Sequence, residues 1–92
     1  MSVAEDDRMR VPKDVHVREF DGELVILDLA KGDYFGVNEV GARLWVGLAR
    51  GKSVKEIAAE FAPDYDVTPS RLVVDLLALA NDFVGRGLLV PC

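Results

Sequence analysis

The sequence predicts an α+β domain in which a three-stranded antiparallel sheet comes first and three helices follow. Two observations support this fold class. Residues 15–37 consist of short β-branched and aromatic runs separated by turn signals, whereas apolar residues recur at helical spacing after residue 38. The chain has 92 residues, of which 50% are hydrophobic, and this suffices for one domain with its own core.

Three strands and two tight turns make up the predicted sheet. Residues 15–20 form the first strand, and Asp21-Gly22 is a two-residue hairpin signal. Residues 23–29 form the central strand, whose continuous apolar run indicates that both faces are partly covered. Lys31-Gly32-Asp33 supplies the second turn, and residues 34–37 close the meander. The outer edge of this third strand is open unless a later segment pairs with it.

End signals predict the first two helices. Asn38 is suited to be the N-cap of the first helix, which ends at Gly51. Residues 53–56 read Ser-Val-Lys-Glu, a capping box in which the hydroxyl and the carboxylate satisfy free backbone N–H groups reciprocally. The second helix then covers residues 54 to about 61, and Pro63 marks its end.

The third helix is the longest and the most apolar. Thr68 is its N-cap, Pro69 occupies its first position, and it runs to about Gly85, before a short extended tail. Most of its apolar side chains span about 160° of arc at 100° per residue, and Val74 and Ala78 widen this surface further. A surface helix needs a stripe of only about 100°. We therefore expect this helix to bury a second surface, under the sheet or under a ligand.

The N-terminal segment and the single cysteine indicate which part of the chain is flexible and in which cellular compartment the protein is expected. Residues 1–14 are polar and charged, and we expect them to form a flexible arm before a domain over residues 15–92. Cys92 is the only cysteine, so no internal disulfide can form. The chain begins without an export signal. A reducing cytoplasm is the expected location.

Charge and hydropathy exclude two classes of partner. The chain has 11 basic and 16 acidic residues and a formal net charge of −5. Affinity for nucleic acid comes mainly from basic side chains that neutralise phosphates, so we expect no nucleic-acid partner. No apolar run reaches the length of a membrane span, so we expect no membrane partner either.

No residue pattern indicates catalysis, a cofactor or a metal. The chain has neither a Ser/His/Asp or Cys/His arrangement with a local signature nor a phosphate-binding glycine loop. His16 is its only histidine, so a cluster of metal ligands is not expected. We predict a protein that is not an enzyme and that binds neither a cofactor nor a metal.

One stretch of the chain carries a family resemblance. From Leu27 to Trp45 it reads Leu-Asp-Leu-x-x-Gly-x-Tyr-Phe-Gly-x-Asn-x-x-Gly-x-x-x-Trp, and the similarity continues through residues 53–57, 65–67, 75–77 and 87–89. This pattern resembles the PqqD-like family, the small peptide chaperones or precursor-peptide recognition elements of ribosomal peptide natural-product pathways. The resemblance covers residues 15 to 90, and its central motif is its most specific part.

The resemblance implies a winged helix-turn-helix-like fold that binds the leader segment of a precursor peptide. The leader would pair with the third strand and lie in a groove against the third helix, so that main-chain hydrogen bonds give affinity and side-chain pockets give specificity. The resemblance also implies a partner enzyme, such as a radical-SAM maturase, a leader protease or a cyclase. The residues that we assign to the peptide site are Asp33, Tyr34, Phe35, Gly36, Val37, Val73, Val74, Leu77, Ala78 and Asn81.

Two alternatives belong to other classes. A winged-helix DNA-binding regulator would place the third helix in the major groove, but this helix offers only Arg71, Arg86 and Asn81 to base edges, against Asp75 and Asp82. A homodimer would use the apolar excess of the same helix against a second copy. The sequence supports two roles equally for the four apolar helix residues of the predicted site. They could pack on a neighbouring helix or a dimer mate, or they could line the peptide groove.

Overall fold

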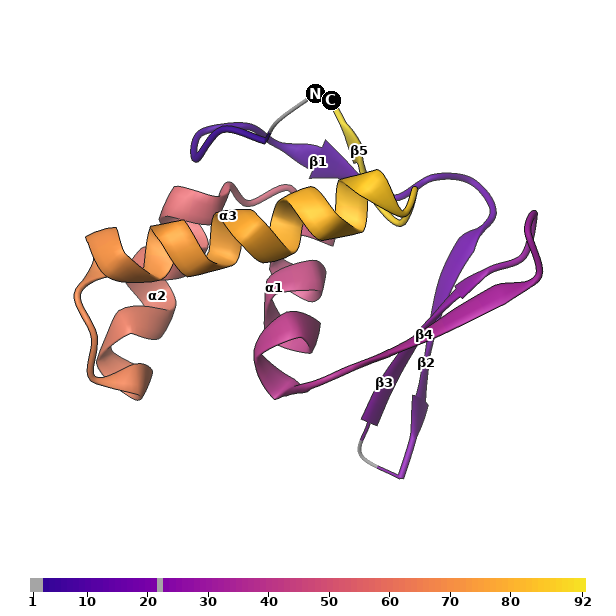
Figure 1. Ribbon diagram of the computed structural model, residues 1–92, viewed down its shortest axis with the longest axis horizontal. Coiled ribbons are helices and arrows are strands. Elements are labelled where there is room, and N and C mark those ends of the chain that lie inside the picture. The colour runs from indigo at the N-terminus through magenta and orange to yellow at the C-terminus, as the bar shows by residue number, and fades with distance from the viewer. Residues whose placement is uncertain (1–2, 22) are drawn as a thin grey trace.

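A three-stranded antiparallel sheet precedes three helices, as the sequence predicts (Figure 1). The computed structural model describes residues 3–21 and 23–92. The elements in chain order are β1 (Met9–Arg10), β2 (Val15–Phe20), β3 (Glu23–Asp28), β4 (Asp33–Val37), α1 (Glu39–Ala49), α2 (Val54–Tyr65), α3 (Pro69–Gly85) and β5 (Val90–Pro91).

The sheet has the order β2-β3-β4, and both of its connections are tight hairpins. Phe20 pairs with Glu23 across the first turn, so the predicted two-residue hairpin is confirmed, although Gly22 itself lies outside the described residues. Gly32 in the second turn has a φ of 73°, a left-handed conformation that glycine adopts without a Cβ clash. β4 is left at the edge of the sheet.

The local end signals of the helices are confirmed. The Asn38 side chain accepts a hydrogen bond from the Gly41 N–H at 2.8 Å. The Ser53 hydroxyl and the Glu56 carboxylate form the reciprocal capping box at the start of α2. α3 begins at Pro69 behind the Thr68 cap and ends at Gly85, as predicted. Each of these signals works within four residues, which is why sequence alone reveals it.

The predicted end of the second helix is wrong. α2 continues through Pro63 to Tyr65. Arg43 of α1 holds this last turn, because its guanidinium donates to Asp64 Oδ2 at 3.1 Å and to the Tyr65 hydroxyl at 3.0 Å. Asp66 then ends the helix in a left-handed conformation. Contacts between helices thus outweigh one missing N–H donor near the end of α2.

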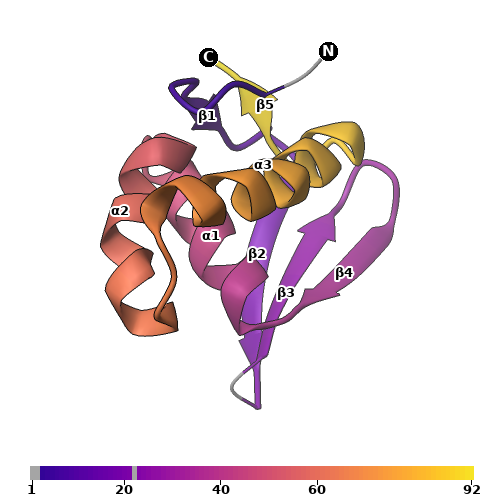
Figure 2. The ribbon, with the colours of Figure 1, turned by 60° about the vertical axis from the view of Figure 1, so that its left-hand side comes forward.

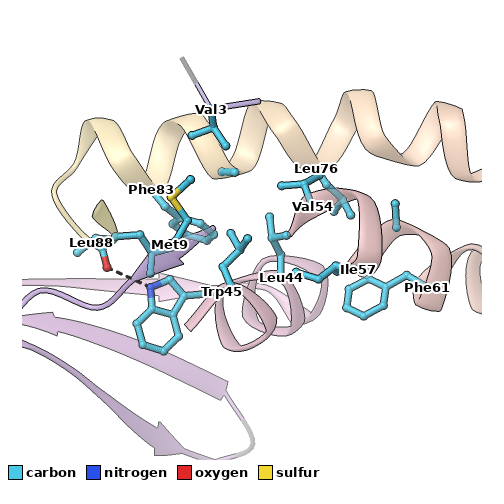
Figure 3. Packing of buried hydrophobic residues seen from close by; sticks show 14 of the residues in the cluster. Val3, Met9, Leu44, Trp45, Val54, Ile57, Phe61, Leu76, Phe83 and Leu88 are labelled. Atoms are coloured by element: carbon cyan, nitrogen blue, oxygen red, sulfur yellow. Dashed lines mark hydrogen bonds between the residues drawn. The ribbon is translucent and has the colours of Figure 1, made fainter. Parts of the chain in front are cut away.

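The three helices enclose the main core, and α3 crosses α1 and α2 (Figures 1 and 3). Leu44, Ile57 and Leu76 contribute one fully buried side chain from each helix. The indole Nε1 of Trp45 donates to the backbone carbonyl of Leu88 at 3.3 Å (Figure 3), which fixes the segment after α3 against α1. The position of that segment matters for the site described below.

The expectation of a flexible arm differs from the structure over residues 3–14. Val3 and Met9 are buried, and β1 pairs with β5 at the other end of the chain. The Val3 N–H donates to Asn81 Oδ1 of α3 at 2.7 Å. Figure 2 shows β1 and β5 on one side of α3 and the sheet on the other. The segment therefore covers part of the apolar excess of α3.

Glu56 links this N-terminal segment to the cap of α2. Its Oε1 accepts from the Ser53 N–H at 2.9 Å and from Arg8 Nη1 at 2.6 Å. These two hydrogen bonds, chiefly that from the Ser53 backbone, lower the pKa of Glu56 from 4.5 to about 2. The ionised carboxylate thus stabilises the fold above pH 4.5, and this contribution is lost as the pH falls towards 2.

A Glu56→Gln variant tests this contribution. Glutamine can still accept the Ser53 hydrogen bond, but it carries no charge for Arg8. We expect the variant to be less stable than the wild type at pH 7, and the difference to vanish as the pH approaches 2. Urea unfolding at a series of pH values measures it, with Glu19→Gln as the control, since Glu19 is exposed and forms no ion pair with the described residues. A difference that stays constant with pH would contradict the role given to this carboxylate.

Candidate functional site

β4 offers an open backbone edge. It pairs with β3 on one side, and among the described residues no strand pairs with its other side. Hydrogen-bonded and non-bonded pairs alternate along antiparallel strands. Phe20 and Glu23 flank the first turn, so they form a hydrogen-bonded pair and the backbone groups of Glu23 face β2. The direction alternates along β3, so the backbone groups that face β4 belong to Leu24, Ile26 and Asp28. The N–H and C=O groups of Tyr34 and Gly36 consequently point away from the sheet.

β4 approaches the end of α3 (Figure 2). A pocket of about 330 Å³ lies there, beside the open edge. Its apolar members include Phe83 and Leu88, both buried, together with two half-buried side chains of β4. Residues from both elements and from the segment after α3 form its walls. They are Tyr34, Phe35, Gly36, Val37, Asp82, Phe83, Arg86 and Leu88.

One ion pair lies on the helical wall of this pocket. Arg86 Nε donates to Asp82 Oδ2 at 3.0 Å, one helical turn away. The Arg86 guanidinium carbon also stands 5.3 Å from the centre of the Phe35 ring, a distance at which cation and ring attract each other. The side chains of Arg86 and Asp82 are about half exposed, at 51% and 55%. A charged rim thus borders an apolar floor next to unpaired strand backbone.

Two other hollows, of about 320 and 510 Å³, adjoin each other around Leu24, Ala42 and Arg43. Ion pairs engage three of their charged side chains, Arg43, Lys52 and Glu60. Arg43 pairs with Asp64 at 3.1 Å, and Lys52 pairs with Glu60 at 2.8 Å. Neither hollow adjoins the outward-facing backbone of Tyr34 and Gly36. The β4 pocket is therefore the better candidate for a binding site.

Comparison with known proteins shows to which family a chain with this strand edge and helix belongs. A family model for coenzyme PQQ synthesis protein D (PqqD) matches residues 23–89. The chain belongs to the PqqD family. The matched range includes β3, β4 and all three helices. No curated protein matches the sequence at a significant level.

Solved structures similar to this PqqD-family chain include two complexes with leader peptides. A lasso peptide synthetase B1 complexed with the leader peptide is 26% identical, with a TM-score of 0.83 over 96% of this chain and 100% of that one. TbiB1 in complex with the TbiA(beta) leader peptide is 31% identical, with a TM-score of 0.78 over 87% and 93%. The PqqD part of Methylobacterium extorquens PqqCD, at 22% identity, a TM-score of 0.75 and coverage of 96% and 94%, shares the fold.

The predicted site residues of this PqqD-family chain are divided between two places. Four strand residues, from Tyr34 to Val37, line the β4 pocket, and Asp33 is exposed at the start of β4. Phe35 packs against the core, whereas Tyr34 is 75% exposed on the opposite face of the sheet. The two aromatic side chains thus lie on opposite faces of the sheet, as successive residues of a strand do.

The predicted helix residues do not line this pocket. Val73 and Leu77 pack against the core, and Val74 and Ala78 are exposed. Asn81 holds the N-terminal segment through Val3, and its Nδ2 donates to the Leu77 carbonyl at 2.9 Å. The structure therefore brings the strand half of the predicted site to one pocket and places the helix half elsewhere.

The pocket residues missed by the sequence analysis are Asp82, Phe83, Arg86 and Leu88. Asp82 and Arg86 lie about 140° around α3 from Leu77 and Asn81, at 100° per residue. From the sequence, Asp82 and Arg86 are weighed only as contacts to DNA bases, and the helix residues assigned to the peptide are four apolar residues and Asn81. The spacing of Asp82 and Arg86, i and i+4 with opposite charges, was the one available signal.

Two further searches cover the described part of the chain. Over residues 3–21 and 23–92, no group of three or more histidine, cysteine, aspartate or glutamate side chains lies close enough together to hold a metal ion. Within the same residues, no helix combines the length and apolar character that crossing a membrane requires.

Proposed function

We propose that this chain binds the leader segment of a ribosomally made precursor peptide and presents it to a modifying enzyme, without catalysing a reaction itself. The observation that carries the proposal is the open edge of β4 beside the pocket at the end of α3. The similarity to two proteins described in complex with leader peptides supports it.

In this proposal the leader adds a strand to the sheet. The outward N–H and C=O groups of Tyr34 and Gly36 supply main-chain hydrogen bonds, which any sequence can make. Alternate side chains of the leader then point towards Phe83 and Leu88, where shape and charge select among sequences. Asp33 begins the same strand, where its exposed side chain lies next to Tyr34. A radical-SAM maturase, a leader protease or a cyclase in a reducing cytoplasm remains the class of partner that we propose.

Two of the α3 residues that the sequence assigned to the peptide site fit a different role. Val74 at 64% exposure and Ala78 leave apolar surface on α3 outside the pocket. Contact with the modifying enzyme or with a second copy of the chain would cover that surface.

A DNA-binding function receives no support from the family or the similar structures. Both arginines of the α3 region are engaged along the helix, Arg71 with Asp75 at 3.8 Å and Arg86 with Asp82 at 3.0 Å. Reading base edges would require breaking these pairs in a chain whose net charge is −5.

Fluorescence polarisation tests the proposal directly. The probes are labelled synthetic leaders from precursor genes adjacent to the gene of this chain, and a labelled DNA duplex is the control. We expect saturable binding of one leader with a micromolar Kd or tighter, about −8 kcal/mol, and no binding to the duplex. Salt-sensitive binding of the duplex without binding of any leader would overturn the proposal.

A further inference from the structure

Arg86 is placed to recognise more than shape in the β4 pocket. Its Nε donates to Asp82, and Phe35 lies beneath the guanidinium. A guanidinium has five N–H donors in a rigid plane. Within residues 3–21 and 23–92, the Nε bond to Asp82 is the one hydrogen bond that Arg86 donates from its side chain. The two terminal nitrogen atoms therefore keep their donors at the mouth of the pocket, in an orientation that Asp82 and Phe35 hold.

A second cation stands at the same end of the pocket. The Nζ of Lys31, in the turn before β4, lies 3.6 Å from the point where a Cβ at Gly87 would stand. Gly87 connects two residues of the pocket wall, Arg86 and Leu88. Lys31 forms no ion pair with the described residues. Asp82 offsets Arg86, and Asp28 and Asp33 flank the turn that carries Lys31, so the nearby charges give no positive excess and recognition depends on the free donors of Arg86.

We propose that the leader is selected by a carboxylate side chain that binds Arg86, in combination with an apolar side chain on the pocket floor. This inference rests on the proposed function and names the peptide chemistry that the site takes. In an added strand, residues i and i+2 point to the same face and lie about 6.4 to 6.8 Å apart. The recognised pattern is therefore an apolar residue and an aspartate or glutamate two positions away.

The floor and the rim contribute differently to this recognition. Burying an apolar side chain against Phe83 and Leu88 gives affinity that depends on size. A leader carboxylate that accepts two parallel N–H donors from Arg86 gives geometric selectivity. Neither a lysine in place of Arg86 nor an amide in place of the leader carboxylate could form this paired, charged contact. Lys31 adds attraction without fixing orientation.

A double-mutant cycle between protein and leader tests the inference. The protein variant is Arg86→Gln, and the matched control is Arg50→Gln, which removes an exposed arginine at the end of α1, outside the pocket. The leader variants replace each aspartate or glutamate, one at a time, with asparagine or glutamine. Polarisation titrations give the Kd for every combination, and thermal melts verify that both proteins are folded.

We expect Arg86→Gln to weaken binding of the unaltered leader about tenfold or more, and Arg50→Gln to leave it unchanged. One leader substitution should weaken binding to the wild type by a similar factor, and Arg86→Gln should add little to that loss. The leader substitution requires no change in the protein, so it gives an answer even if Arg86→Gln does not fold.

Two outcomes separate this inference from the function on which it rests. If leaders bind the wild type but no acidic substitution and no change at Arg86 affects the Kd, the carboxylate inference is overturned and leader binding stands. If no leader binds the wild type, the proposed function fails, and the inference fails with it.

Discussion

Replacing Gly36 with proline is expected to weaken leader binding by about 2 kcal/mol or more, roughly 30-fold, while the domain stays folded. Gly36 pairs with Val25, but its own backbone groups point to the outer edge of β4. Proline is tolerated on an edge strand where the missing N–H faces outward. The substitution therefore removes one main-chain donor from the leader and puts a ring in the path of the added strand. Polarisation titration measures the loss.

Two further substitutions serve as comparisons for Gly36→Pro. Among the described residues, a Cβ at position 36 would meet no atom within 4 Å apart from its chain neighbours, and alanine keeps the N–H, so Gly36→Ala should keep the main-chain hydrogen bonds to the leader. Phe35 bonds towards β3 opposite Ile26, so Phe35→Pro should disrupt the sheet itself. A folded Gly36→Pro variant that binds as tightly as the wild type would show that the leader does not pair with β4.

The strands and most helix ends could be predicted because their signals are local. Asn38 and the Ser53–Glu56 box act within one turn, and the turn at Gly32 needs only a residue that accepts positive φ. Pro63 misled the prediction because the contacts that extend α2 come from Arg43, some twenty positions earlier. Local rules cannot weigh a contact of that kind.

The strand and helix parts of the predicted site differ in how far the sequence defines them. Tyr34 to Val37 could be assigned because a short edge strand, together with the family resemblance, defines one linear segment. The face of α3 could not be chosen in the same way. Its apolar residues surround most of the helix, so periodicity does not distinguish the flank beside the sheet from the flank beside Val3. The predicted helix residues lie towards the second flank, where Asn81 holds the N-terminal segment through Val3.

Met9→Ala is expected to destabilise the domain by about 2 to 4 kcal/mol. Met9 is only 2% exposed and belongs to the same buried cluster as Phe83 and Leu88 (Figure 3). Truncation to alanine removes apolar contacts and leaves a cavity, because backbone pairing between β1 and β5 limits how far the site can collapse. Urea unfolding of both proteins measures the difference.

Arg10 provides the matched control, since it is the other residue of β1 and its side chain is exposed. Arg10→Ala should change the stability by less than about 0.5 kcal/mol. The contrast separates burial of the Met9 side chain from any general disturbance of β1. Equal and small effects of the two substitutions would mean that the N-terminal segment contributes little to folding in solution, as its polar composition suggests. A large effect of Met9→Ala alone would establish that burial of the Met9 side chain, in addition to that of Val3, joins a segment rich in charge to the core.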